Sequence, residues 1–363
     1  MFHTEKNLSI SVDLDIYPNC TSKLPSLSQV NPTKVVIMVF VGIFFVLFGL
    51  LGNVLVILAV VRHRHLHSVP HYLIANLAVA DLLLSFTVVP FYASLELLDC
   101  WVWGQRLCDM WLSLDVLCCT ASIFTLCVIS VDRWMAISNP LRYPSRVTTK
   151  HALGAVLAVW VLSAAISVGP LFGWKKLKPD NDTLVCKVNQ DIGYVIFSNT
   201  CSFYVPLLVI LVMYCKVYVV AQKQMRSIRK GLWHGNVKDR EMHHSGNVTQ
   251  LQAKDSCGNE EYLTGKCHSY GIQNRLRKFS REMKAAKTLA VVVGCFVLCW
   301  LPFFLLLPIS SFSENHSSLD QALSISAWFC YFNSCLNPII YPCFSKDFRK
   351  AFINFLNFFA FTD

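Results

Sequence analysis

Residues 108–134 read CDMWLSLDVLCCTASIFTLCVISVDRW, a stretch that is apolar enough to lie in a lipid bilayer. It carries one carboxylate, Asp115, inside the apolar run and an Asp132–Arg133 pair near its far end. Asp115 and Arg133 are 18 residues apart, which corresponds to about 27 Å and about five full turns of α-helix. One helix face would therefore present an acid towards one membrane surface and a cation towards the other. Because an ionisable residue inside a membrane is costly, it marks a functional site, and we expect the rest of the chain to explain its partner.

The whole chain has the composition of an integral membrane protein. Of its 363 residues, 54% are hydrophobic and only 15% are charged, with a mean hydropathy of +0.47, which is unlike a soluble domain. Open strand edges cannot lie in lipid, so apolar stretches of about 20 residues are predicted to be helices. Seven such stretches recur, at about residues 35–61, 70–96, 105–138, 150–172, 191–223, 283–309 and 321–343.

We therefore predict an all-α membrane protein, with a seven-transmembrane helix bundle over residues 35–343. An odd number of spans places the two termini on opposite sides of the membrane. Most of the 32 Lys and Arg residues fall in segments that are cytoplasmic if residues 1–34 are extracellular, as the positive-inside rule requires. The net charge of +10 then reflects topology and attraction to anionic membrane lipid, and nucleic acid is not an expected partner. Three glycosylation sequons lie on the predicted outer side, at Asn7, Asn19 and Asn181.

Four of the 16 cysteines also face the predicted outside. Cys108 lies at the outer end of the third helix and Cys186 in the loop before the fifth, so a disulfide between them would hold that loop over the mouth of the bundle. A second disulfide between Cys20 and Cys100 is a hypothesis, and its alternative is two free thiols.

The cytoplasmic side contains two polar segments. Residues 225–279 are rich in Gly, Asn, His, Lys and Glu and show little periodicity, which predicts a long disordered loop. In residues 344–363, the sequence SKDFRKAFINF places apolar side chains at helical spacing. We expect a short amphipathic eighth helix at the membrane surface, followed by a cytoplasmic tail.

The first candidate site is built around Asp115, about two turns below the outer end of its helix. No Lys or Arg lies in the outer half of another predicted span, at the depth of Asp115, so an amine ligand is the expected partner for the carboxylate. Cys119 lies one turn further on the same face, and Val116 lies beside the acid.

Two other helices supply groups that suit the rest of such a ligand. Ser198 and Ser202 are four residues apart and offer two hydroxyls, while Phe303 and Phe304 follow Trp300 by one turn and offer ring faces to an aromatic ring and an ammonium. Taken singly, serines in transmembrane helices also bond to their own backbone, and phenylalanines also face lipid or core. The interpretation therefore depends on the combination with Asp115.

A second candidate site consists of polar residues near mid-membrane depth on four different helices. These are Asn53, Asp81, Ser122, Asn333 and Asn337. Their oxygen atoms could converge, together with waters, on a small cation such as sodium, and a structural hydrogen-bond network is the alternative. No other cofactor is expected.

A third group faces the cytoplasm and has the elements of a switch. Glu282 could pair with Arg133 and hold the third and sixth helices together, with Asp132, Tyr214 and Tyr341 nearby. The alternative is a solvated rim with no switching role. Prolines in three spans provide weak points at which helices can rearrange, namely Pro206, Pro302 and Pro338.

One signature on nearly every helix marks a family resemblance. The motifs are Asn53, Leu77-Ala-x-Ala-Asp81, Asp132-Arg133, Trp160, Pro206, Cys299-Trp-Leu-Pro302 and Asn337-Pro-x-x-Tyr341. Together they resemble a rhodopsin-like (class A) G-protein-coupled receptor over nearly the whole chain, and Asp115 resembles the amine anchor of its aminergic members. Longer stretches are similar to alpha-1 adrenergic receptors: RHRHLHS, DVLCCTASI, GPLFGW, SFYVPLLVILVMYC, FSREMKAAKTL, CWLPFF and YFNSCLNPIIYPC.

The resemblance implies a plasma-membrane receptor for a catecholamine, not an enzyme. It places Asp115 on the ammonium, the serine pair on the catechol hydroxyls, the phenylalanine pair on the ring and Trp300 beneath as a switch; Val188 and Tyr331 complete the predicted ligand site. It also implies a heterotrimeric G protein as partner, of the Gq type, with phospholipase C and calcium downstream. A receptor for octopamine, tyramine or another biogenic amine is the alternative.

The sequence lacks the features that other classes of membrane protein would need. A transporter or channel would need charges along a continuous pathway and internal symmetry, and a membrane enzyme would need converging His, Glu or Asp at one membrane face. Three positions depart from the family pattern: Trp134 replaces the Tyr of Asp-Arg-Tyr, Ala327 replaces a Phe over the amine, and Asn199 replaces Ala or Ser beside the serine pair.

Overall fold

The computed structural model describes residues 32–98, 100–139, 142–169, 186, 191–246, 259–312 and 317–360. Over 228–246 and 259–278 only the backbone is described. The described residues are almost entirely helical and contain no strand. The predicted glycosylation sites Asn7, Asn19 and Asn181 lie outside them, as do Cys20 and Val188.

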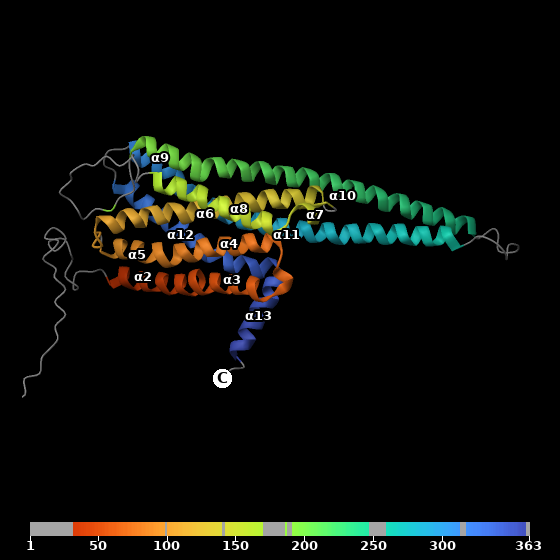
Figure 1. Cartoon of the computed structure of the whole chain (residues 1–363), viewed down its shortest axis with the longest axis horizontal. Helices are drawn as coiled ribbons and strands as arrows, with labels where there is room; N and C mark the ends of the chain where they lie inside the picture. The colour runs from red at the N-terminus through yellow and green to blue at the C-terminus, as the bar shows by residue number, and fades with distance from the viewer. Residues whose placement is uncertain are drawn as a thin grey trace, which may run out of the picture.

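The helical spans run side by side along the long axis of the bundle (Figure 1). The first comprises α2 (Pro32–Phe44), η2 (Phe45–Gly52) and α3 (Asn53–Arg62), and the second α4 (Val69–Leu83), η4 (Leu84–Val88) and α5 (Val89–Leu98). The third is α6 (Gln105–Ser138) and the fourth α8 (Thr149–Val168). The fifth comprises α9 (Ile192–Asn199), η6 (Thr200–Tyr204) and α10 (Val205–Gly246), the sixth is α11 (Asn259–Phe312) and the seventh α12 (Ser317–Phe344).

Six of these spans are long and apolar enough to cross a membrane when length and composition alone are considered. The seventh, α12, is more polar because it contains several Ser and Asn residues. Those that are buried are Ser326, Asn333, Ser334 and Asn337. It nevertheless packs along α11 and against η2, α4 and α3. The predicted seven-helix membrane bundle is therefore confirmed, and the polar residues of α12 face its interior.

Two glycines let the first span approach its neighbours closely. A Cβ atom on Gly52 would lie 2.8 Å from Cβ of Pro338 on α12, and one on Gly49 would lie 2.7 Å from Oγ of Ser85 in η4. Both glycines lie in η2, a π-helical stretch. Small residues at such contacts let membrane helices pack backbone to backbone, where van der Waals contact is the main attractive force.

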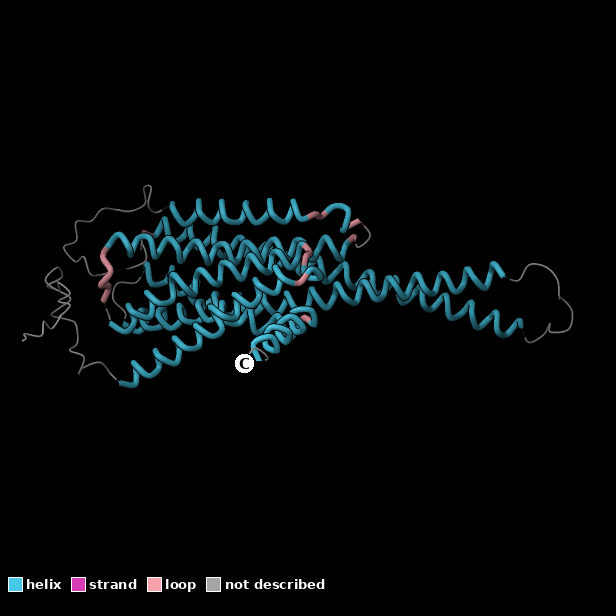
Figure 2. The backbone as a smooth tube through the Cα atoms, turned by 60° about the horizontal axis from the view of Figure 1, so that its bottom comes forward, coloured by secondary structure: helices cyan, strands magenta, loops and turns pink. Residues whose placement is uncertain are grey.

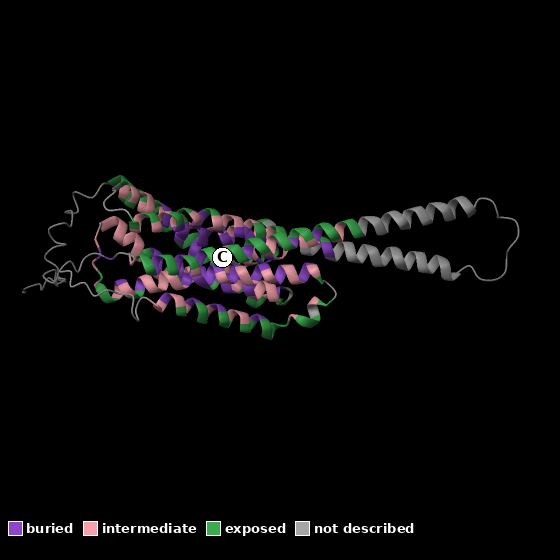
Figure 3. Cartoon of the chain, turned by 90° about the horizontal axis from the view of Figure 1, so that it is seen from above, coloured by how far each residue is buried: buried purple, intermediate pink, exposed green. Residues whose placement is uncertain are grey.

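The bundle has a packed interior and an apolar exterior. Figure 3 shows buried residues concentrated along the centre and exposed residues on the outward helix faces. Those outward faces include large apolar side chains such as Phe40, Phe86 and Leu298, which are 68%, 68% and 75% exposed. Apolar side chains this exposed on nearly every helix are suited to contact with lipid chains.

The fifth and sixth spans extend well beyond the bundle, and this corrects the predicted loop at residues 225–279. α10 continues to Gly246 and α11 starts at Asn259, and the two extensions run side by side (Figures 1 and 2). The sequence between Pro206 and Pro302 contains no proline to end either helix. A helix already formed in the membrane needs no new nucleus, so polar residues with adequate propensity can propagate it outwards.

Two short helices complete the cytoplasmic side. The predicted amphipathic helix is confirmed as α13 (Lys346–Ala360), longer than expected, and its residue Phe348 stacks on Tyr341 with ring centroids 5.5 Å apart. Helix α7 (Tyr143–Arg146) was not predicted; it lies in the segment between α6 and α8. Its first residue, Tyr143, reaches the Asp132–Arg133 pair described below.

Candidate functional site

Asp115 lies inside the bundle on α6 and is held there by two side chains. Its Oδ1 accepts a hydrogen bond from Sγ of Cys119 at 3.4 Å, and its Oδ2 accepts one from the hydroxyl of Tyr331 on α12 at 3.3 Å. Asp115 is half-buried as a residue, and it forms no salt bridge with any described Lys or Arg. Two weak hydrogen bonds compensate the charge of a carboxylate inside the bundle only in part. A bound cation would therefore stabilise it. Val116, the next residue on α6, is half-buried.

Tyr331, which contacts Asp115, belongs to a cluster of four aromatic side chains. The ring of Tyr331 lies 5.0 Å from that of Tyr92 on α5 and 6.3 Å from that of Trp328, and Tyr92 stacks on Trp111 with centroids 6.4 Å apart. Sequence reasoning identified Tyr331 but missed the other three. The spacing of Trp328 and Tyr331, three residues apart on one helix face, was the available signal. These rings give the site the electron-rich walls that an ammonium group prefers.

The predicted serine pair is buried on the fifth span, but each hydroxyl already has a partner. Ser198 donates to the backbone carbonyl of Val195 at 3.3 Å, and Ser202, in η6, accepts from the hydroxyl of Thr120 on α6 at 3.2 Å. Both residues are less than a tenth exposed. A hydroxyl bonded to its own backbone can rotate to a ligand, because that bond is local and weakly stabilising.

Asn199, one of the three departures from the family pattern, contacts the sixth span instead of the candidate ligand. Its amide donates to the backbone carbonyl of Phe304 at 3.5 Å, and the hydroxyl of Tyr204 donates to the same carbonyl at 2.8 Å. Pro308 lies four residues after Phe304 and has no N–H with which to bond that carbonyl. The two side chains of the fifth span therefore satisfy an acceptor that the proline leaves open.

The predicted aromatic residues of α11 form a stacked column. Phe304 stacks on Phe203 with centroids 4.4 Å apart, and lies 5.9 Å from Trp300, which stacks in turn on Phe296 at 5.6 Å. Phe303 meets Phe304 edge to face at 5.7 Å and is the more accessible of the pair. The ring faces of Phe304 are thus largely used within the protein, and Phe303 is freer to contact a ligand.

The second candidate site gathers around Asp81, which is buried on α4. Its Oδ1 accepts from the hydroxyl of Ser334 at 3.0 Å and its Oδ2 from the amide of Asn337 at 2.6 Å, and Ser122 also donates to it. Among the described residues, the amide oxygens of Asn53, Asn333 and Asn337 are buried without a hydrogen-bond partner.

This donor set fits a small hard cation. One carboxylate, two hydroxyls and unpartnered amide oxygens are the ligands that such an ion prefers. Buried acceptors without donors are also rare, so a cation or waters would satisfy them. No group of three or more His, Cys, Asp or Glu is found in the described part of the chain, which leaves Asp81 as the charge of the site.

The third candidate site is a buried ion pair at the cytoplasmic end of α6. Arg133 donates through Nε and a terminal nitrogen to Oδ2 of Asp132, at 3.1 and 2.5 Å, and both residues are buried. The hydroxyl of Tyr143 donates to the other oxygen of Asp132 at 2.5 Å. Tyr143 was missed because it lies between two predicted spans, 11 residues further along, where nothing in the sequence marks a contact.

The remaining predicted switch residues are only partly placed. Tyr341 is buried, Tyr214 is half-buried, and Pro338 lies against Gly52 in the contact described above. The side chain of Glu282 is not among those described, so its pairing with Arg133 stays a prediction.

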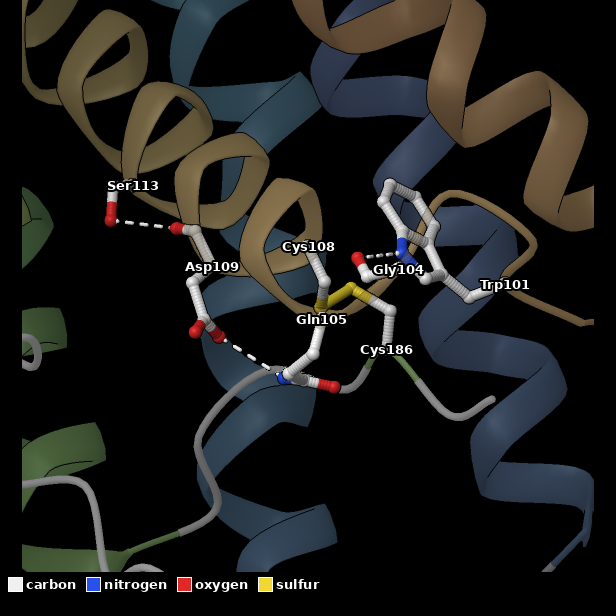
Figure 4. Close-up of a disulfide and its surroundings, with 7 residues drawn as sticks. All are labelled: Trp101, Gly104, Gln105, Cys108, Asp109, Ser113 and Cys186. Atoms are coloured by element: carbon white, nitrogen blue, oxygen red, sulfur yellow. Dashed lines mark hydrogen bonds between the residues drawn. A yellow bond between two sulfur atoms is a disulfide. The ribbon is translucent and has the colours of Figure 1, made fainter. Parts of the chain in front are cut away.

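The predicted disulfide between Cys108 and Cys186 is present (Figure 4). It ties Cys186, which precedes α9 in the chain, to the first turn of α6. Gly104, just before that turn, has φ = 78°, a conformation that favours glycine, and its carbonyl accepts from the indole of Trp101 at 2.8 Å. Cys100 is also disulfide-bonded. Because Cys20 lies outside the described residues, its pairing with Cys100 stays a prediction.

Comparison with known proteins gives concordant matches along the chain. The family model "7 transmembrane receptor (rhodopsin family)" matches residues 52–341. The chain is 52% identical over 341 residues to the alpha-1A adrenergic receptor of Oryzias latipes, which covers 93% of this chain and 70% of the relative. It is 50% identical over 339 residues to the human alpha-1A adrenergic receptor, covering 93% and 71%. Against the human alpha-1D adrenergic receptor the identity is 46% over 325 residues, covering 87% and 56%.

Proposed function

This chain belongs to the rhodopsin family of seven-transmembrane receptors, within its alpha-1 adrenergic group, and from that membership we propose that it is a receptor for a catecholamine of the adrenaline and noradrenaline type. Proteins of this family are receptors and not enzymes, and they are multi-pass proteins of the plasma membrane. The observation that carries the proposal is Asp115, a carboxylate inside the bundle that has no described cationic partner.

In this proposal, the ligand ammonium pairs with Asp115 beneath the aromatic group of Tyr92, Trp111 and Tyr331. The hydroxyl of Tyr331 and the thiol of Cys119 orient the carboxylate, each through one oxygen. The ring of the ligand lies against Phe303. Its hydroxyls exchange hydrogen bonds with Ser198 and Ser202 on the opposite helix.

The proposal extends to signalling through a heterotrimeric G protein of the Gq type, with phospholipase C and calcium release downstream. On the cytoplasmic side, Asp132 engages Arg133 and Tyr143. Release of Arg133 would expose a cation at the mouth of the bundle, as Tyr214 and Tyr341 rearrange around it. A ligand can drive this change only by binding the active arrangement more tightly than the inactive one.

The direct test is calcium release in cells that express the receptor, over a panel of biogenic amines. Asp115→Asn retains the shape of the side chain but removes the charge, and is expected to reduce potency by at least about 30-fold, since truncating one partner of a buried charge pair costs about 2 kcal/mol or more. Asp320→Asn removes an exposed carboxylate from the outer end of α12 and serves as the matched control. Unchanged potency in Asp115→Asn at equal surface expression would contradict the proposal.

The second candidate function is a receptor for an amine with one ring hydroxyl, such as octopamine or tyramine. It is favoured by the partners that Ser198 and Ser202 already have within the protein. Ser198→Ala and Ser202→Ala separate the two possibilities. If the ligand is a catecholamine, both variants lose noradrenaline potency, whereas a one-hydroxyl ligand makes one of the two substitutions silent.

We also assign a sodium ion to the site around Asp81, as an allosteric ligand. The unpartnered amide oxygens of Asn333 and Asn337 support it. Sodium chloride, compared with the same concentration of N-methylglucamine chloride, is expected to lower agonist affinity in the unmodified receptor and not in Asp81→Asn. An equal response of the two proteins to sodium would reject the site.

A further inference from the structure

A groove of about 550 Å³ opens on the lipid-facing surface between the cytoplasmic halves of α6 and α10. Trp134 of α6 forms one wall. The other wall comes entirely from α10 and is formed by Leu211, Val212, Cys215, Lys216, Val219 and Val220. Neither the candidate amine site nor the cation site around Asp81 shares any of these residues.

The α10 wall is one continuous helix face. Its residues fall into three adjacent pairs that repeat every four positions, which places them one above the other along the helix. Leu211, Val212 and Val219 are 51%, 42% and 49% exposed, so the groove opens outwards and not into the bundle. An apolar channel in this position is suited to an extended hydrocarbon chain lying parallel to the helix.

Lys216 places a cation in this apolar wall. Its Nζ lies 5.5 Å from the centroid of the Trp134 ring, which stabilises the ammonium without neutralising it. The described side chains of α10 include no Asp or Glu, and the nearest acid along α6, Asp132, is buried and engaged by Arg133 and Tyr143. No described carboxylate forms a salt bridge with Lys216.

We expect the cytoplasmic end of the groove to lie at the depth of the lipid headgroups. Trp134 directly follows Arg133 near the inner end of α6, and Lys223 and Arg226 are the next basic residues along α10, where we expect the helix to leave the membrane. Lys223 lies seven residues beyond Lys216, about 10 Å further along the helix and within about 20° of the same face. The Lys216 ammonium can therefore extend towards the interface, with a second basic residue further out on the same side.

We propose that this groove binds an anionic phospholipid of the cytoplasmic leaflet. One acyl chain lies along the α10 face from Leu211 to Val219, and the acidic headgroup contacts Lys216 and faces Lys223. The cytoplasmic leaflet supplies such lipids, and each basic residue near its surface adds about 1 kcal/mol of attraction. The indole of Trp134 belongs to the interfacial region, where tryptophan is enriched.

The bound lipid would contact Trp134, the residue next to Arg133 of the proposed switch. Trp134 also packs against the cluster of Ile137, Val217 and Phe279 that joins α6, α10 and α11 at their cytoplasmic ends. Trp134 therefore contacts both the groove and the helices that we expect to separate when Arg133 is released. Occupancy of the groove is expected to stabilise the arrangement in which this cluster is intact.

The test uses the full-length receptor in bilayer nanodiscs that contain trace phosphatidylserine or phosphatidylcholine, each with a photoactivatable acyl chain. After irradiation, labelled peptides are mapped by mass spectrometry. We expect the peptide containing residues 211–220 to be labelled about fivefold more by phosphatidylserine, the factor that corresponds to about 1 kcal/mol for one basic residue. Equal labelling by the two lipids would overturn the proposal.

Three variants make the test specific. Lys216→Gln is expected to lower phosphatidylserine labelling to the phosphatidylcholine level. Lys216→Arg keeps the positive charge and is expected to retain the labelling of the unmodified receptor. Lys150→Gln removes one charge from the same membrane face, at the start of α8 and outside the groove, and should leave labelling unchanged. Unchanged labelling in Lys216→Gln, or displacement of the phospholipid probe by an equimolar free fatty acid, would overturn the assignment.

Discussion

Gly52→Ala is a sharp test of how the first span meets the seventh. The added Cβ would lie 2.8 Å from Cβ and 3.0 Å from Cγ of Pro338. Both atoms belong to a rigid ring within α12, so neither can rotate away. Overpacking of this kind costs about 1–3 kcal/mol, against a gain of up to about 1 kcal/mol from the higher helix propensity of Ala. A net destabilisation of up to about 2 kcal/mol is expected.

Two other glycines of the same span provide matched controls. At Gly42 nothing lies within 4 Å of the added Cβ, so Gly42→Ala is expected to leave stability unchanged or raise it slightly. At Gly49 the Cβ would meet Oγ of Ser85 at 2.7 Å and its Cβ at 3.2 Å. The Ser85 hydroxyl can rotate, so Gly49→Ala is expected to fall between the other two.

The assay is the temperature at which half of the purified receptor is lost from its monodisperse form in detergent. Because membrane receptors often unfold irreversibly, the ranking at one heating rate is the meaningful quantity. The expected order of stability is Gly42→Ala, then Gly49→Ala, then Gly52→Ala. If Gly52→Ala is as stable as Gly42→Ala, the close contact between η2 and α12 is not as tight as described, and the reasoning fails.

Three tyrosine substitutions test individual hydrogen bonds. Tyr331→Phe removes a donor to Asp115 and should weaken agonist binding about tenfold, since a hydrogen bond to a charged group contributes about 1.5 kcal/mol or more; unchanged radioligand competition would refute it. Tyr143→Phe removes a donor to Asp132 and should change basal calcium signalling, because one of the groups that hold the buried ion pair is lost; basal activity equal to that of the unmodified receptor, at equal expression, would contradict this role. Tyr204→Phe removes a donor to the backbone carbonyl of Phe304 and should lower the free energy of unfolding by about 1 kcal/mol. Unchanged stability would show that Asn199 alone satisfies that carbonyl and would contradict the prediction.

The spans and the orientation of the bundle could be read from the sequence because they depend on local quantities. Length and hydropathy decide whether a helix can cross a bilayer, and the distribution of Lys and Arg decides which side faces the cytoplasm. The predicted third span, residues 105–138, has the same limits as α6. The seventh was also predicted, although its buried Ser and Asn residues lower its hydropathy.

Polarity misled the prediction where it was taken as a sign of disorder. Residues 225–279 are polar, but the backbone is helical up to Gly246 and again from Asn259. A polar sequence shows that a segment does not enter the membrane; it does not show that the segment is unfolded. The prediction from composition did not take into account that an existing helix can extend without a new nucleation step.

Contacts between residues far apart in sequence needed the tertiary structure. Asn199 was recognised as unusual, but only the fold shows that it bonds a carbonyl left open by Pro308, more than a hundred residues away. Tyr143 and Tyr92 carry no motif and were not singled out, yet each reaches a central group of a candidate site. A side chain's partner depends on how helices pack, and packing is not encoded in any single helix.

By itself, the sequence determined that this chain crosses the membrane seven times and that Asp115 and Arg133 lie on one helix, about five turns apart. The cost of burying a charge is enough to make both residues candidates for function. Only the tertiary structure decided which groups from other helices meet this site pair, namely Tyr331 at Asp115 and Tyr143 at Asp132, the partner of Arg133. It also placed Trp134 beside Lys216 on the lipid-facing surface. Whether a segment can cross the membrane is set by its local composition, whereas contacts between helices require the spatial arrangement of the whole bundle.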